Sequence, residues 1–141
     1  MINQYSRTEL LIGSDGLEKL KNSRVAVFGV GGVGGFTVEA LARSGVGTID
    51  IIDNDTVSLT NINRQIIATH STVGKLKVDV MKERIRDISP STVVNKYDCF
   101  FLPENAENFD FRRFDYVVDA IDTVSGKIGL AEKCKEYNVK L

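Results

Sequence analysis

The sequence contains few cysteines, prolines and histidines, and each shortage excludes a class of protein. Cys99 and Cys134 are the only cysteines among 141 residues, too few for a disulfide framework or a four-cysteine zinc site. We therefore expect a reducing, cytoplasmic compartment. Only two prolines occur and no low-complexity tract, so nothing marks an interdomain linker. The one histidine, His70, has no partner at metal-ligand spacing, which favours a surface position.

Long apolar runs and an excess of one charge are also absent. No run approaches the ~18 apolar residues of a membrane span, and the N-terminus lacks the features of a signal peptide, so we expect no membrane partner. The 18 basic and 19 acidic side chains leave a net charge of −1. This argues against a strongly basic nucleic-acid clamp, although a local patch for RNA remains compatible with it. The composition predicts one globular domain over residues 1–141.

Strand-like and helical segments alternate along the chain. Short β-prone runs predict buried strands at Arg24–Phe28, Thr48–Ile52, Thr92–Asp98 and Tyr116–Ile121. Apolar spacing predicts two short helices within Glu9–Lys21 and further helices over Gly32–Ser44, Lys75–Ile88, Pro103–Phe109 and Val124–Tyr137. This alternation predicts a Rossmann-like α/β fold with three layers, a mostly parallel sheet with helices on both faces.

The final residues, Asn138–Leu141, have the pattern of a strand that begins as the chain stops. We therefore expect a truncated domain, the N-terminal ATP-binding part of a longer chain.

A glycine-rich turn follows the first predicted strand. Gly29, Gly31 and Gly34 form a G-x-G-x-x-G pattern between a strand and a helix. Gly29 permits the tight turn, Gly31 and Gly32 let backbone amides approach phosphate oxygens, and Gly34 allows close packing of helix on strand. The helix N-terminus then attracts an anion. The alternative is a purely structural turn.

Asp53 follows the second strand, nineteen positions after Gly34. This is close to the ~20-residue offset of the acidic residue that holds a ribose in nucleotide-binding folds. Capping of the next loop is the other interpretation. Up to this point an NAD-dependent dehydrogenase and an ATP-binding enzyme predict the same residues.

Polar residues after Asp53 favour a triphosphate over a dinucleotide. They are Asp55, Asn61, Asn63, Arg64 and Gln65, in a long loop at the carboxyl end of the second strand. Arg64 offers a planar fork to phosphate oxygens, and Lys77, in the first turn of the next helix, offers a point charge. Asp122 follows the strand at Tyr116–Ile121, and a carboxylate there suits Mg²⁺ between phosphates. The competing interpretations are a solvated charge pair for Arg64 and Lys77, and strand-end capping for Asp119 and Asp122.

These motifs resemble the adenylyltransferases related to ubiquitin-activating enzymes. The resemblance runs nearly end to end, through SRVAVFGVGGVGG, GVGTIDIIDNDTVSLTNINRQ, VGKLK and DAID. It implies an enzyme that uses ATP and Mg²⁺ to adenylate a carboxylate. It also implies nucleotide contacts from Gly32, Asp53, Asn61, Arg64, Gln65, Lys77 and Asp122. Arg7, in YSR, matches the arginine that in this family reaches into the partner subunit's active site, which implies a homodimer.

Within the family, EALARSGVG, TNINRQIIA and DAIDTVSGK look most like the branch that acts on threonylcarbamoyladenosine in transfer RNA. That resemblance implies an ATP-driven dehydration, in which the carboxylate attacks the α-phosphate and the acyl adenylate cyclises with loss of AMP. A second hypothesis is activation of the C-terminus of a ubiquitin-like sulfur-carrier protein. A non-enzymatic nucleotide sensor and an NAD-dependent oxidoreductase are further alternatives, but a sensor has no use for Arg64, Lys77 and Asp122.

Several other residues have ordinary interpretations. Cys99 and Cys134 are expected to be small buried residues, and Phe100 and Phe101 are expected in the core rather than as a stacking platform for bases. Arg112 and Arg113 are expected in a solvated turn.

Overall fold

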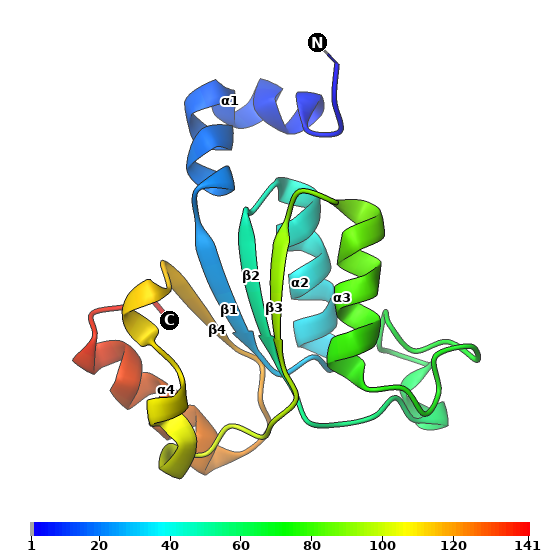
Figure 1. Ribbon diagram of the computed structural model, residues 1–141, viewed down its shortest axis with the longest axis vertical. Helices are drawn as coiled ribbons and strands as arrows, with labels where there is room; N and C mark the ends of the chain where they lie inside the picture. The colour runs from blue at the N-terminus through cyan, green and yellow to red at the C-terminus, as the bar shows by residue number, and fades with distance from the viewer. Residues whose placement is uncertain (1) are drawn as a thin grey trace.

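The structure, a computed structural model that describes residues 2–141, contains one sheet of four parallel strands (Figure 1). The strands are β1 (Arg24–Phe28), β2 (Thr48–Ile52), β3 (Val93–Tyr97) and β4 (Tyr116–Asp119). Their order across the sheet is β3-β2-β1-β4. Strands β1 and β2 have the predicted bounds, because each apolar run ends where a glycine or an aspartate leaves the sheet.

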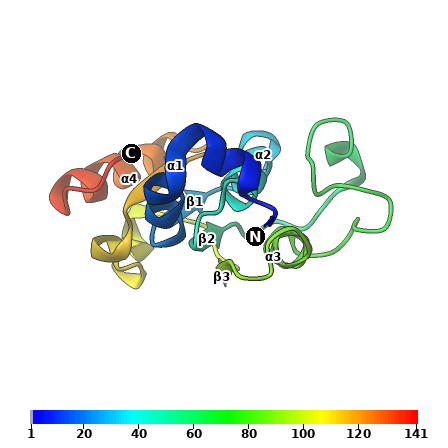
Figure 2. The same cartoon turned by 90° about the horizontal axis from the view of Figure 1, so that it is seen from above.

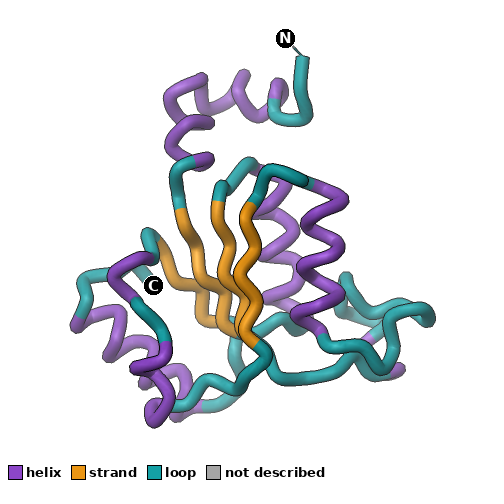
Figure 3. The backbone as a smooth tube through the Cα atoms, viewed as in Figure 1, coloured by secondary structure: helices purple, strands orange, loops and turns teal. Residues whose placement is uncertain are grey.

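Helices cover both faces of the sheet, so the predicted three-layer Rossmann-like architecture is confirmed (Figures 1 and 3). α2 (Gly32–Ser44) and α3 (Lys77–Ile88) lie on one face. α4 (Val124–Glu136) lies on the other, with the short 3-10 helices η2 (Pro103–Asn108) and η3 (Phe111–Arg113). Neighbouring residues of a strand point to opposite faces. Val27 therefore joins the core under α2 and α3, whereas Phe28 joins an aromatic core with Phe101, Phe109 and Phe111.

Helix α1 (Ser6–Lys21) lies at the amino ends of the strands (Figures 1 and 2). It bends at Gly13, whose φ of +75° interrupts the helix, so the two short helices predicted from the sequence are the two halves of α1. No residue of α1 is buried, and none of the helices in the described part of the chain is long and apolar enough to cross a membrane.

Several element ends differ from the prediction by one to three residues, and those of α3 and β4 have a clear physical reason. α3 begins at Lys77 because Leu76 is extended and forms an antiparallel bridge with Thr56. β4 ends at Asp119, the last residue paired with β1, because β1 leaves the sheet at Gly29. The predicted terminal strand has one parallel bridge, between Lys140 and Tyr116 on the free edge of β4.

Glu39 of α2 forms two ion pairs, one with Arg43 of the same helix and one with Arg84, which joins α2 to α3. Its carboxylate accepts hydrogen bonds from Arg84 Nε on α3 at 2.7 Å and from Arg43 Nε at 2.9 Å. These bonds, chiefly the one from Arg84, hold the pKa of Glu39 below its ordinary value of 4.5. A depressed pKa stabilises the folded state above pH 4.5, and this stabilisation is lost as the pH falls through the folded-state pKa.

Replacing Glu39 should therefore flatten the acid limb of the stability profile. We expect the melting temperature of Glu39→Gln to fall less than that of the wild type between about pH 5 and pH 3. Glu132→Gln, which changes an exposed glutamate without hydrogen bonds in the described structure, is the matched control. An equal fall of the melting temperature with pH in wild type and Glu39→Gln would contradict this role of Glu39.

Candidate active site

The candidate site lies at the carboxyl ends of the strands, between β1 and β4. The chain leaves β1 toward β2 on one side, whereas β4 packs against the other side of β1. This reversal of strand order opens a crevice at the carboxyl edge, the position where open α/β sheets bind ligands. The turn after β1, the long loop after β2 and the segment after β4 all meet there (Figure 1).

Two glycines of the predicted turn are required by close backbone approach. Gly29 has a φ of +98°, and a Cβ there would lie 2.3 Å from the carbonyl oxygen of Ala120. A Cβ at Gly34 would lie 1.8 Å from the Gly29 carbonyl oxygen. Gly34 therefore packs the helix closely against the turn, as predicted, and does not line the cavity. The N-terminus of α2, at Gly31 and Gly32, opens into the cavity.

Adjacent helical glycines provide a matched test of this packing. We expect Gly34→Ala to lose folding stability and nucleotide binding together, because the new methyl group would displace the turn at Gly29. Gly35→Ala should keep both, since its Cβ would meet only the Ile66 side chain, at 3.4 Å. Thermal melting and titration with ATP measure the two effects. Equal melting temperatures and equal ATP affinities of the two variants would contradict this steric explanation.

A cavity of about 510 Å³ occupies the crevice. It brings together nine of the predicted site residues: Gly29, Gly31, Gly32, Asp53, Asp55, Arg64, Gln65, Lys77 and Asp122. Its apolar lining comes from the end of β2 and from the segments that follow β3 and β4, and it includes Ile52, Phe100, Phe101 and Ile121. The cavity therefore combines an apolar wall with charged groups, as a nucleotide requires.

Asp53 connects the glycine turn to the loop after β2. One carboxylate oxygen accepts a hydrogen bond from the Val30 amide at 2.7 Å, and the other accepts one from the Asp55 amide at 2.8 Å. Asp53 therefore caps the loop, and it also lines the cavity, where its contact with a ribose stays a prediction. Its two bonds fix the turn and the loop relative to each other.

Lys77 is held at the cavity by the chain that precedes it. Its amide donates to the carbonyl of Asp55 at 3.0 Å, next to the bridge between Thr56 and Leu76. The Lys77 side chain is only 7% exposed, and its Nζ lies 3.6 Å from Asp55 Oδ2, whose side chain is 66% exposed. A buried ammonium with one loosely placed, solvated partner is available to an incoming anion.

Arg64 and Gln65 are positioned by Asn61. The Asn61 carbonyl accepts the amides of Arg64 at 3.1 Å and Gln65 at 2.9 Å, and its side-chain oxygen accepts the Ser58 amide at 2.9 Å. Asn61 does not line the cavity, and its hydrogen bonds give it a positioning role, whereas its direct contact with a nucleotide stays a prediction. Among residues 2–141, the Arg64 guanidinium bonds only to its own loop, at Thr60 and Asn63, and it is exposed.

Two cavity-lining oxygens are buried without a hydrogen-bond partner in the described structure: Gln65 Oε1 and Thr123 Oγ1. Unpaired buried polar atoms are costly, and a bound ligand is one way to satisfy them. Thr123 was not predicted from the sequence.

The charges of the cavity do not suit a bare anion. Three carboxylates, Asp53, Asp55 and Asp122, stand against two cations, Arg64 and Lys77, so the ionisable lining sums to −1. Within residues 2–141, no three histidine, cysteine or acidic side chains gather into a metal site. A divalent cation here would need oxygens from the ligand itself. This donor set fits Mg²⁺, which is commonly held by one or two carboxylates and substrate phosphates.

Arg7 lies outside the cavity. It is exposed on the first turn of α1, at the amino ends of the strands, whereas the cavity is at their carboxyl ends (Figure 1). Arg7 therefore cannot reach the cavity of the same chain with this fold.

The segment after β3 differs in part from the prediction. Phe101 is buried as predicted, but Phe100 is 42% exposed and lines the cavity together with Cys99. Burial, together with the charge of Asp98, raises the pKa of the Cys99 thiol, which keeps it protonated at neutral pH. The available signal was position, because the residues directly after a parallel strand lie at the carboxyl edge of the sheet.

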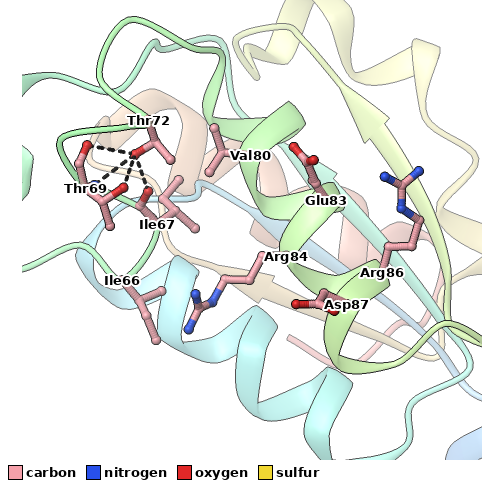
Figure 4. A pocket seen from close by; sticks show the side chains of 9 residues that line it. All are labelled: Ile66, Ile67, Thr69, Thr72, Val80, Glu83, Arg84, Arg86 and Asp87. Carbon is pink, nitrogen blue, oxygen red and sulfur yellow. Dashed lines mark hydrogen bonds between the residues drawn. The ribbon is translucent and has the colours of Figure 1, made fainter.

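A second groove of about 510 Å³ lies between residues 66–72 and α3 (Figure 4). Its wall includes Thr72, whose hydroxyl donates to the Ile67 carbonyl at 2.7 Å, and Arg84 of the α2–α3 ion pair. None of the predicted site residues lines this groove.

Comparison with known proteins agrees with this arrangement. The chain is 53% identical over all 141 residues to the tRNA threonylcarbamoyladenosine dehydratase of Bacillus subtilis, of which it covers 56%. It is 40% identical over 123 residues to the adenylyltransferase and sulfurtransferase UBA4 of Vanderwaltozyma polyspora, covering 85% of this chain and 28% of that protein.

Solved structures give the same result. The crystal structure of Escherichia coli tRNA N6-threonylcarbamoyladenosine dehydratase in complex with ATP matches 98% of this chain with a TM-score of 0.95 and 40% identity. The chain covers 57% of that structure, so it spans about half the length of its dehydratase relatives. The ThiF family matches residues 5–141. With its glycine turn, its nucleotide-sized cavity and this match over nearly its whole length, the chain belongs to the ThiF family.

Proposed function

We propose that this chain is the ATP-binding part of a cytoplasmic dehydratase that acts on threonylcarbamoyladenosine in transfer RNA. One observation carries the proposal: a single cavity holds the glycine turn, Arg64, Lys77 and Asp122, which come from four separate stretches of the sequence. The proposal is supported by three bacterial dehydratases that are 41% to 53% identical to the chain.

In this proposal the cavity binds ATP. The amides of Gly31 and Gly32, at the N-terminus of α2, face phosphate oxygens, where the partial positive charge of a helix favours an anion. Asp53 holds the ribose, and Phe100 and Ile121 belong to the apolar wall that receives the base. Gln65 Oε1 gains the partner that it lacks among the described residues.

Asp122 would hold Mg²⁺ together with phosphate oxygens, and Asp55 is within the same cavity. When bound, the cation neutralises phosphate charge and balances the carboxylates of the lining.

The chemistry needs no nucleophile from the protein. The substrate carboxylate attacks the α-phosphate of ATP, the bond to the β-phosphate breaks, and pyrophosphate leaves. A nucleophile within the modified nucleoside then attacks the acyl carbon, and AMP leaves with one oxygen of the original carboxylate. Both reactants of the first step are anionic, so Arg64 and Lys77 act by stabilising the charge that develops in the transition state.

Arg7 completes the site from a second subunit in this proposal. The position of α1 excludes action within one subunit. Leu10 and Leu11, on the next turn, are 86% and 87% exposed, which is unusual for leucine and suits a contact with another copy of the chain. The active protein is therefore a homodimer that shares residues between its two sites.

Activation of a ubiquitin-like sulfur-carrier protein is the second candidate. It is favoured by the 40% identity to an adenylyltransferase and sulfurtransferase, and it would use the same cavity for the same first step. The two functions differ only in which carboxylate enters the site.

The experiment offers both carboxylates. The purified full-length protein is incubated with ATP, Mg²⁺ and transfer RNA that carries threonylcarbamoyladenosine, and the nucleosides are analysed by mass spectrometry. We expect the modified nucleoside to lose one water and AMP to form, with no product when ATP is omitted. A parallel reaction contains a sulfur-carrier protein instead of RNA. An AMP adduct on the carrier C-terminus, without water loss in the RNA, would contradict the proposal and support the second candidate.

A further inference from the structure

Tyr5 anchors the start of α1 to the main body of the protein. Its hydroxyl lies 2.5 Å from the Ser89 hydroxyl, directly after α3, and Ser89 is fully buried. Ser89 in turn bonds to Thr92 at 2.7 Å, and Thr92 donates to the Val46 carbonyl at 3.1 Å. The hydroxyl of Tyr5 therefore ends a chain of hydrogen bonds that reaches the core, where Val46 is 1% exposed.

The Tyr5 ring makes a second contact, with the end of α2. Its Cδ1 and Cε1 lie 3.4 Å from the position of a Cβ at Gly45, the left-handed residue that ends α2. Gln4 adds a hydrogen bond from Nε2 to the Ile88 carbonyl at 3.0 Å. The residues just before α1 thus connect the ends of α2 and α3.

The first half of α1, which follows these residues, has few other contacts with the rest of the protein. We call Ser6–Ile12, up to the kink at Gly13, the arm. The arm has no buried residue, and it projects beyond the amino ends of the strands (Figures 1 and 2). Arg7 lies on its first turn, two residues from Tyr5. The direction in which Arg7 points away from the subunit therefore depends on how Tyr5 is held.

We propose that Tyr5 is a positioning residue for catalysis, because its contacts with Ser89 and Gly45 orient the arm and present Arg7 to the other subunit. This inference rests on the proposed function, in which Arg7 acts in the partner's cavity. Tyr5 itself touches no substrate. Its effect is on the partner's site and not on the cavity of its own subunit.

Complementation between subunits tests this directly. Tyr5→Ala is expected to lower kcat about 100-fold, as loss of orientation does elsewhere, with unchanged ATP affinity. Lys77→Ala has an inactive cavity but an intact arm. In a mixed dimer the Lys77→Ala subunit lends its arm to the intact cavity of the Tyr5→Ala subunit, so mixing the two inactive variants should restore activity. A merely structural role of Tyr5 within its own subunit would leave the mixture inactive.

The mixture of Arg7→Ala with Lys77→Ala separates the two proposals. If this mixture recovers activity and the Tyr5→Ala mixture does not, the positioning role of Tyr5 is wrong and the proposed action of Arg7 stands. If neither mixture recovers, both are wrong. Recovery in both mixtures supports both.

Tyr5→Phe keeps the ring and provides a milder test in case Tyr5→Ala does not fold. We expect it to lower kcat roughly threefold to tenfold, the factor of one hydrogen bond. Hydrogen exchange of the amides in the arm should become faster in Tyr5→Phe, while exchange in β1 and β2 stays unchanged. Tyr116→Phe removes a hydroxyl that has no hydrogen bond in the described structure and is the matched control. Equal exchange of the arm in Tyr5→Phe and wild type would overturn the proposal.

Discussion

Lys77→Ala is expected to lower kcat for ATP-dependent turnover by about 100-fold to 1,000-fold, the usual effect of removing one preorganised donor from a transition-state site. The Lys77 ammonium is buried at the cavity wall, where surrounding protein strengthens its field. Its only ion-pair partner in the described structure, Asp55, is largely exposed and is solvated when the lysine is lost. We therefore expect the fold to persist, with a melting temperature close to that of the wild type.

Lys75→Ala is the control for this variant. Lys75 is two residues away, exposed and outside the cavity, so its removal should leave kcat unchanged. Arg64→Ala should likewise lower kcat, whereas its control Arg86→Ala, outside the cavity, should leave kcat unchanged. Full ATP-dependent activity in Lys77→Ala or Arg64→Ala would contradict the assignment of the site.

Asp50→Ala is expected to lower the free energy of unfolding by about 3 to 5 kcal/mol, the cost of leaving one member of a buried ion pair without its partner. Asp50 is fully buried on β2. Arg24 donates to both of its carboxylate oxygens at 2.8 Å, and the Tyr97 hydroxyl donates to Oδ1 at 3.0 Å. Burial, with the neighbouring Asp50 charge, raises the pKa of Tyr97, which keeps this donor protonated.

An exposed pair of the same chemistry is the control. Asp79 bonds to Lys96, and both side chains are nearly half exposed, so Asp79→Ala should cost less than about 1 kcal/mol. Chemical denaturation of both variants measures the difference. Equal losses would show that burial of the Asp50 group does not control its contribution.

The strands and helices could be predicted because local patterns specify them. β1, β2 and α2 have the predicted bounds, since apolar runs and helical spacing end at glycine or aspartate. The Arg24–Asp50 pair was not predicted. It joins residues on neighbouring strands, and only the register of β1 against β2 brings them together.

The candidate site was predictable where a strand end carries the residue. Asp53 and Asp122 could be assigned to one edge because parallel strands end there together, and Lys77 could be assigned there because the helix that it begins follows the loop after β2. The positioning role of Asn61 depends on hydrogen bonds within the loop, and the exposure of Phe100 depends on how the chain leaves β3. Neither the role of Asn61 nor the exposure of Phe100 can therefore be predicted from residue type or spacing.

The central step of the proposed reaction is the attack of a substrate carboxylate oxygen on the α-phosphate of ATP in the cavity between β1 and β4. A single reaction tests this step. It contains unlabelled ATP, Mg²⁺ and transfer RNA whose threonylcarbamoyladenosine carries oxygen-18 in its carboxylate. The account predicts that mass spectrometry finds the label in AMP and none in pyrophosphate. Label that appears only in water, or in phosphate released together with ADP, would contradict it.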